Sequence, residues 1–106
     1  MKSFILPGKN PSENLSCSIP FSDMLSVGEI INTISVTITV ASGSDPTPSS
    51  VLSGVPTTDT TNTYGIFVLT GGVSGATYLI SVLVTGSLTT IALKEGYLSI
   101  VPTNPF

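Results

Sequence analysis

The sequence of 106 residues contains no histidine, arginine or tryptophan, and it contains a single cysteine. The absence of histidine excludes a Ser-His-Asp triad, histidine-ligated metal sites and imidazole acid–base catalysis. The absence of arginine, together with a net charge of −3, leaves no cationic surface for the phosphates of DNA or RNA. We therefore expect no nucleic-acid partner, and many classes of enzyme are excluded.

The carboxylates are also poorly placed for chemistry. Each of the six lies alone in a predicted loop or strand end: Glu13, Asp23, Glu29, Asp45, Asp59 and Glu95. Asp45 and Asp59 are the candidate calcium ligands, but neither loop has the repeated acidic residues that hard cations prefer. The glycine-rich 71–75 segment lacks the lysine and the helix of a phosphate-binding loop. We predict a protein that is not an enzyme and that has no cofactor or metal site.

The single cysteine and the N-terminal residues are informative about the compartment in which the protein is made. Cys17 alternates with Leu15 and Ile19, which predicts a small buried side chain; a reactive thiol is the alternative. Residues 1–7 lack the apolar core of a secretory signal, and no run approaches the roughly 20 apolar residues of a membrane span. We expect a protein made in the cytoplasm, with no membrane partner.

Charge of either sign is scarce. Charged residues make up 8% of the chain, whereas the chain has 16 serines and 15 threonines. The surface must therefore be rich in hydroxyl groups. Because interspersed charge normally protects a soluble protein from association, we infer that neighbouring copies or partners cover much of this surface.

The chain is rich in β-branched runs with a period of two. In residues 65–86, two such runs flank a glycine-rich turn, which is typical of two adjacent antiparallel strands. Strands are predicted at 13–19, 30–41, 51–55, 63–70, 77–85 and 89–101, the last as one strand or a pair with a bulge near Gly96. About seven antiparallel strands in a chain of this length predict an all-β fold, a single immunoglobulin-like β-sandwich spanning residues 1–106.

Alternation within two strands predicts the core. Its members are Ile34, Val36, Ile38, Val40, Tyr78, Ile80, Val82 and Val84. Tyr78 opens its strand after a glycine-containing turn, as in a tyrosine corner, where the hydroxyl bonds the backbone upstream. Phe21 and Leu25 are expected to plug one end of the sandwich.

The two termini lack a period and contain prolines. Residues 1–12 are predicted to form an extended arm and residues 102–106 a short tail. The apolar side chains of these segments are the predicted partner-binding residues: Phe4, Ile5, Leu6 and Phe106. The alternative is that both segments are frayed ends.

Three motifs carry a resemblance to a known family. They are Lys9-Asn10-Pro11, Leu25-x-x-Gly28-Glu29-Ile30 and Leu69-Thr70-Gly71-Gly72-Val73-x-Gly75-x-x-Tyr78. Through them, roughly residues 9–101 resemble small bacteriophage and prophage virion proteins described as fiber-tail adaptors, which are immunoglobulin-like. That family commonly has a tryptophan in the first loop and a Gly-Arg pair before the final strand, whereas this chain has Phe21 nearby and Leu93-Lys94 in place of the pair.

The resemblance implies a non-enzymatic structural protein of the virion that joins a fiber to the tail or neck. Its implied partners are other virion proteins, of the fiber, tail, neck or capsid, and symmetric homo-oligomeric copies of itself. Low charge and a hydroxyl-rich exterior agree with burial between subunits. Two alternatives stay open: a capsid decoration or head-fiber protein, and a surface module that binds host glycans through exposed tyrosines.

Overall fold

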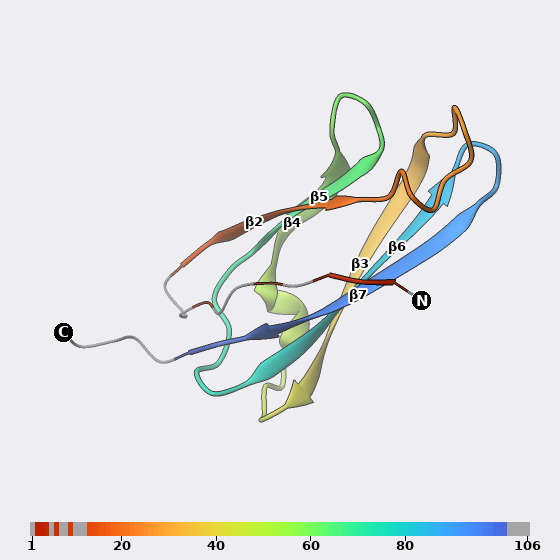
Figure 1. Cartoon of the computed structure of the whole chain (residues 1–106). Coiled ribbons are helices and arrows are strands. Elements are labelled where there is room, and N and C mark those ends of the chain that lie inside the picture. Colours follow the sequence, from red (N-terminus) through yellow and green to blue (C-terminus); the bar gives the residue numbers. More distant parts are fainter. Residues whose placement is uncertain (1, 5, 7–8, 10–12, 102–106) are drawn as a thin grey trace.

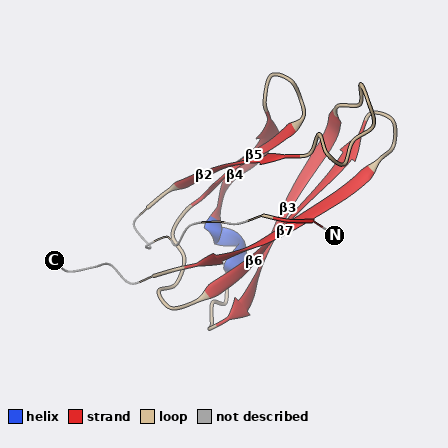
Figure 2. Ribbon diagram, viewed as in Figure 1, coloured by secondary structure: helices blue, strands red, loops and turns tan. Residues whose placement is uncertain are grey.

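The computed structural model describes residues 2–4, 6, 9 and 13–101 (Figure 1). Within them the elements are β1 (Lys2–Ser3), β2 (Leu15–Pro20), β3 (Ile31–Ser42), the 3-10 helix η1 (Pro48–Val51), β4 (Leu52–Thr58), β5 (Tyr64–Leu69), β6 (Thr77–Gly86) and β7 (Ile91–Ser99). Strands dominate the described part, as Figure 2 shows, and no helix in it is long and apolar enough to cross a membrane. The predicted all-β class is confirmed.

The strands form two layers that face each other (Figure 1). One layer has the order β2-β5-β4 and the other the order β7-β6-β3, and all neighbours in these sheets are antiparallel. β1 adds a two-residue parallel pairing on the outer side of β7. In place of about seven antiparallel strands, the described chain therefore has six, in two three-stranded sheets, with β1 as a short parallel addition.

The core lies between the two layers. Tyr78, Ile80, Val82 and Val84 of β6 are completely buried. Ile38 of β3 is also buried, and Ile34, Val36 and Val40 are partly buried and pack against the core. The opposite layer contributes Cys17, Ile19, Phe67 and Leu69. Since full burial of one large apolar side chain gives about 1.5–3 kcal/mol, the buried residues of this core together stabilise the fold substantially.

Two further predictions about buried side chains are confirmed. Phe21 is fully buried at one end of the core, and Leu25 packs against it partly buried. Cys17 is 5% exposed, and burial raises the pKa of its thiol to about 11. The thiol is therefore protonated at neutral pH, as expected of a cysteine that serves as a small apolar side chain.

The prediction that the two runs of residues 65–86 are adjacent strands of one hairpin is wrong. β5 pairs with β2 and β4, whereas β6 pairs with β3 and β7, so the intervening 70–76 connection crosses from one sheet to the other. Gly71 and Gly72 have φ angles of 60° and 99°, a region that favours glycine, and they turn the chain over the end of the sandwich. Two strands facing each other across a core have the same period of two as two strands in one sheet, so the pattern cannot separate them.

One strand boundary and one predicted bulge also differ from expectation. β4 extends to Thr58 because its pairing with β5, which breaks after Ser53, resumes at Thr57. Pro56 lies in the break, where no N–H group is needed. In β7 the register with β6 is continuous, and the bulge expected near Gly96 is absent. Glycine is needed there for another reason: a Cβ atom would lie 2.5 Å from the Phe4 ring.

Candidate interaction surfaces

The loops of the sandwich gather at two ends, which we call the tip and the base. The tip consists of residues 21–30, 59–63 and 87–90, at the upper right of Figure 1, joined by backbone bonds such as Phe21 N–H to the Thr63 carbonyl at 2.9 Å. The base consists of residues 43–47, 70–76 and 99–101. It is joined in the same way, by Gly75 N–H to the Ile100 carbonyl at 2.8 Å.

Glu29 holds the loops of the tip together. Its side chain is only 3% exposed, although it lies in a loop. Oε1 accepts a hydrogen bond from Ser26 N–H at 2.9 Å, and Oε2 accepts bonds from Leu88 N–H at 2.9 Å and Thr90 N–H at 3.1 Å. The hydrogen bond from the Thr90 side chain, followed by these backbone donors, lowers the pKa of Glu29 to about 2. A Cβ atom on Gly86 would overlap this carboxylate, which explains the glycine at that position.

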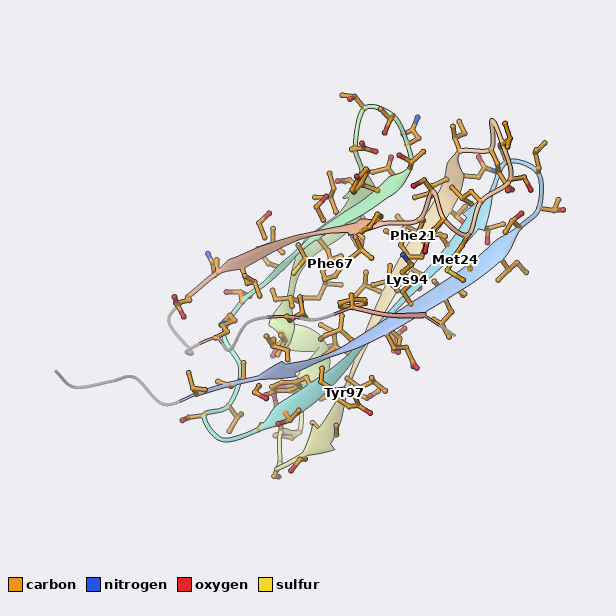
Figure 3. The ribbon with its side chains drawn as sticks, viewed as in Figure 1. Phe21, Met24, Phe67, Lys94 and Tyr97 are labelled. Carbon is orange, nitrogen blue, oxygen red and sulfur yellow. The ribbon has the colours of Figure 1, made fainter. Side chains whose placement is uncertain are left out.

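Lys94 is the second charged group inside the tip. Its side chain projects inward from β7 and is 7% exposed. Nζ donates to the Pro20 carbonyl and to Asp23 Oδ1, the latter at 3.0 Å. It also lies 5.2 Å from the centre of the Phe21 ring, within the range of a cation–π interaction, and Figure 3 shows the two side chains together. The cation thus fixes the start of the 21–30 loop to β7.

The outer surface of the tip is apolar. Val27 is fully exposed, and Leu88 and Ile30 are 60% and 42% exposed. Beside them lies an open hollow of about 360 Å³, lined by residues of the 22–30 segment and by Thr63. The Glu29 carboxylate in its wall is already occupied by backbone N–H groups, so the hollow offers no free acid or base.

Tyr78 holds the base together. Its hydroxyl accepts a hydrogen bond from Val73 N–H at 2.9 Å and donates one to Asp45 Oδ2 at 2.7 Å. Burial and the bond to Asp45 raise the pKa of Tyr78, while the same bond lowers the pKa of Asp45. The predicted bond from the tyrosine hydroxyl to the upstream backbone is confirmed.

Replacement of Tyr78 by phenylalanine should lower the free energy of unfolding by about 1–3 kcal/mol. The substitution keeps the buried ring but leaves Val73 N–H and the Asp45 carboxylate without the hydroxyl. Urea unfolding followed by circular dichroism measures the change, and Tyr97→Phe, at a tyrosine that is 61% exposed, is the matched control. Equal stabilities of the two variants would contradict a structural role for the Tyr78 hydroxyl.

Lys9 attaches the start of the chain to the base. It is 1% exposed, and its Nζ donates to the Gly71 carbonyl at 2.6 Å. Its backbone N–H donates to the carbonyl of Ser99, the last residue of β7, and its carbonyl accepts a hydrogen bond from Val101 N–H. Desolvation lowers the pKa of Lys9, and the charge of Glu13 opposes that shift. Two of the three sequence motifs therefore meet here, since Lys9 belongs to one and Gly71 to another.

The other predicted chemical groups have structural partners. Asp45 accepts Thr47 N–H at 2.9 Å besides the Tyr78 bond, and Asp59 accepts the N–H groups of Thr63 and Tyr64, both at 3.1 Å. Among the described residues, no group of three or more histidine, cysteine, aspartate or glutamate side chains is placed to hold a metal ion. These two carboxylates organise turns.

Comparison with known proteins identifies the relatives of this two-ended sandwich. A family model described as the podophage GP4 fiber-tail adaptor protein gp77 matches residues 9–94. The chain belongs to this family. It is a fiber-tail adaptor of the podophage virion, a structural and non-enzymatic protein, and the resemblance drawn from the three motifs is confirmed. No curated protein matches the chain.

Phe21 and Lys94 are in contact, with the Lys94 ammonium 5.2 Å from the centre of the Phe21 ring. The ring and the cation thus form one pair that connects the 21–30 loop to β7. Sequence reasoning missed this role of Lys94, although its place in the alternation Ala92, Lys94, Gly96, Leu98 was a signal that it faces inward.

The predicted partner-binding residues of the adaptor have different locations. Phe4 and Leu6 are partly buried and pack against the core of their own domain, with Phe4 N–H bonded to the Glu95 carbonyl at 3.0 Å. Ile5 and Phe106 lie outside the described residues. The structure therefore does not gather these four residues into one described site.

The tyrosines do not form a single platform. Tyr78 is buried, while Tyr64 on β5 and Tyr97 on β7 are 39% and 61% exposed on different sheets. Figure 3 shows Tyr97 pointing away from the sandwich. A flat sugar needs a row of exposed rings, so this arrangement gives no support to the glycan-binding alternative.

Proposed function

We propose that the chain is an immunoglobulin-like adaptor module that attaches through its tip to one of its two virion partners, the fiber or the tail. An adaptor of this family binds fiber and tail proteins. The observation that carries the proposal is the exposed apolar surface of Val27, Ile30 and Leu88, presented by loops that Glu29 and Lys94 fix from within. We call these three residues the tip surface.

Strand order supports the immunoglobulin-like assignment. Constant-type immunoglobulin sandwiches have one layer formed by their first, second, fifth and fourth strands and another formed by their seventh, sixth and third strands. The orders β2-β5-β4 and β7-β6-β3 correspond to these layers, except that β1 pairs with β7 and not with β2. The bond from the hydroxyl of Tyr78, at the start of β6, to Val73 further supports the assignment.

Physical chemistry favours the tip surface as an attachment site. Large exposed apolar side chains cluster where proteins bind one another, and burial of one such side chain gives about 1.5–3 kcal/mol. The loops beneath are held by buried hydrogen bonds, so little conformational entropy is lost when a partner docks. Many equivalent sites on one particle add to the strength of attachment.

The test is the assembly of particles with Val27→Glu. A charge at this fully exposed position should not affect folding, but it should reduce the number of fibers on each particle by at least about fivefold, because a carboxylate would be buried at the joint. Val55→Glu is the matched control, since Val55 is 85% exposed on β4, away from the tip. Fiber number is counted by electron microscopy.

The same particles identify which partner the tip binds. If Val27→Glu particles lack the adaptor itself, the tip binds the tail; if they keep the adaptor and lose fibers, the tip binds the fiber. Quantitative mass spectrometry of purified particles separates these results. Normal numbers of adaptor and fiber would show that the tip is not an attachment surface.

Partner binding by Phe4, Ile5, Leu6 and Phe106 stays a prediction. For Phe4 and Leu6 it requires release of the N-terminal segment from the core of its own domain, because both side chains pack there. That release would also uncover Gly96 of β7, against which the Phe4 ring lies. The tip surface has no such requirement and is therefore the attachment site that we favour.

A further inference from the structure

Each sheet has two outer strands, and most of these edges carry features that prevent further pairing. β7 is partly covered by β1 and by the Lys9–Ile100 bridge. β2 ends in Pro20, and β4 contains Gly54 and Pro56 within a break of register. Proline, breaks and covering segments are the usual means by which proteins protect an edge, since unpaired N–H and C=O groups recruit further strands.

The free edge of β3 lacks this protection. β3 is the last strand of its sheet, and no described strand pairs with its other side. It is 12 residues long and contains no charged residue, proline or glycine. Its pairing with β6 is regular from Thr33 to Val40 and irregular only at its ends. β4 and η1 lie near β3, but neither forms a ladder with it.

Burial of the inward-facing side chains also indicates an incomplete layer. In β6, the central strand, Ile80, Val82 and Val84 are completely buried. In β3, Ile38 opposite Ile80 is buried, but Ile34 and Val36, opposite Val84 and Val82, are only partly buried although they face the same core. An added strand would cover the edge and remove more of this apolar surface from water.

We propose that the β3 edge pairs antiparallel with β3 of a second copy of this chain. The inference goes beyond the tip attachment and deepens the proposed function, because it names the surface at which adaptor copies meet.

The β3 sequence is self-complementary in this arrangement. Its outward side chains are the hydroxyl residues Thr33, Ser35, Thr37 and Thr39, and its inward ones are Ile34, Val36, Ile38 and Val40. Any antiparallel register that keeps the faces in phase sets hydroxyl beside hydroxyl and aliphatic beside aliphatic. No pair of like charges is created, because the strand has no charges.

The pairing joins two three-stranded layers into one continuous sheet across a two-fold axis. A two-fold contact is closed, so it yields a dimer and not an open fibre. It leaves the tip surface free, because Val27 and Leu88 lie in loops beyond the end of β3. Two tips are thereby presented by one dimer.

The experiment uses the full-length purified chain, which separates this inference from particle attachment. Analytical ultracentrifugation over a range of concentrations should show a monomer–dimer equilibrium. The double variants Ser35→Lys/Thr37→Lys and Ser35→Glu/Thr37→Glu should each weaken self-association by at least about tenfold, because like charges then face each other across the axis. An equimolar mixture of the two should restore the dimer. Both positions, Ser35 and Thr37, are exposed, which allows the variants to fold.

Ser53→Lys/Thr57→Lys is the matched control, because both residues are exposed on the β4 edge. It should dimerise like the unmodified chain. Hydrogen exchange on the unmodified chain gives a readout that does not depend on variants: amide protection of β3 should rise with protein concentration. A chain that stays monomeric, a dimer insensitive to the β3 lysines, or variants that do not recombine would each overturn the inference, whatever the result of the Val27→Glu test.

Discussion

Replacement of Lys94 by alanine is expected to lower the free energy of unfolding by about 3 kcal/mol, as measured by urea unfolding. The side chain is 7% exposed, so its loss leaves a cavity in the tip. The Pro20 carbonyl loses its donor, and the Phe21 ring loses the cation 5.2 Å from its centre. These losses occur together because one side chain connects β7 with the 21–30 loop.

Two variants separate the contributions of volume and charge. Lys94→Met keeps most of the side-chain volume and should cost only about 1–2 kcal/mol, because the Asp23 side chain is 42% exposed and therefore accessible to water. A double-mutant cycle with Phe21→Leu should give a coupling energy of about 0.5–2 kcal/mol between ring and ammonium. If Lys94→Ala unfolds with the stability of the unmodified chain, Lys94 does not secure the tip.

The alternation of side chains was sufficient to predict the core and the class of fold. Ile80, Val82 and Val84 alternate with residues that are less buried, and an alternating strand can bury only one face. Tyr78 was predictable for a similar local reason, since a tyrosine at the start of a strand after a glycine-rich turn reaches back to that turn. The sequence alone predicts a structural feature when the local pattern of residues is compatible with only one geometry.

Sheet membership was not predictable in the same way. β5 and β6 are consecutive and lie in different layers, while Lys2 and Lys94 pair across almost the whole chain. Strand partners depend on how loops cross the sandwich, and a period of two holds no information about that crossing. The pairing of β1, only two residues long, has no period at all and was predicted as part of an extended arm.

The buried charges were missed because a lone charged residue in a sequence normally indicates a solvated surface. Glu29 is buried because three backbone N–H groups from two loops converge on it, and loops 57 or more residues apart cannot be placed together from sequence. Lys94 differs, since its inward register in β7 was visible in the alternation. The structure was therefore needed to show those contacts of the tip that form between loops distant in the sequence.

Replacement of Glu29 by glutamine should lower the melting temperature at neutral pH by roughly 10 °C. Glutamine presents an NH₂ group where the second carboxylate oxygen accepted a hydrogen bond, so at least one backbone N–H of Ser26, Leu88 or Thr90 loses its acceptor. The loops of the tip then separate more readily. Scanning calorimetry measures the shift, and Glu13→Gln, at an exposed glutamate, is the matched control.

The same substitution should change how stability depends on pH. The pKa of Glu29 is about 2 in the folded chain and 4.5 ordinarily, so the ionised carboxylate stabilises the fold fully above pH 4.5 and this contribution disappears as the pH falls toward 2. The difference in melting temperature between the unmodified chain and Glu29→Gln should therefore narrow across that interval. Some acid sensitivity should persist in the variant, because the pKa values of Asp45 and Asp59 are also lowered in the folded chain. A difference that stays constant from neutral pH to pH 2 would show that the negative charge of Glu29 does not hold the tip together.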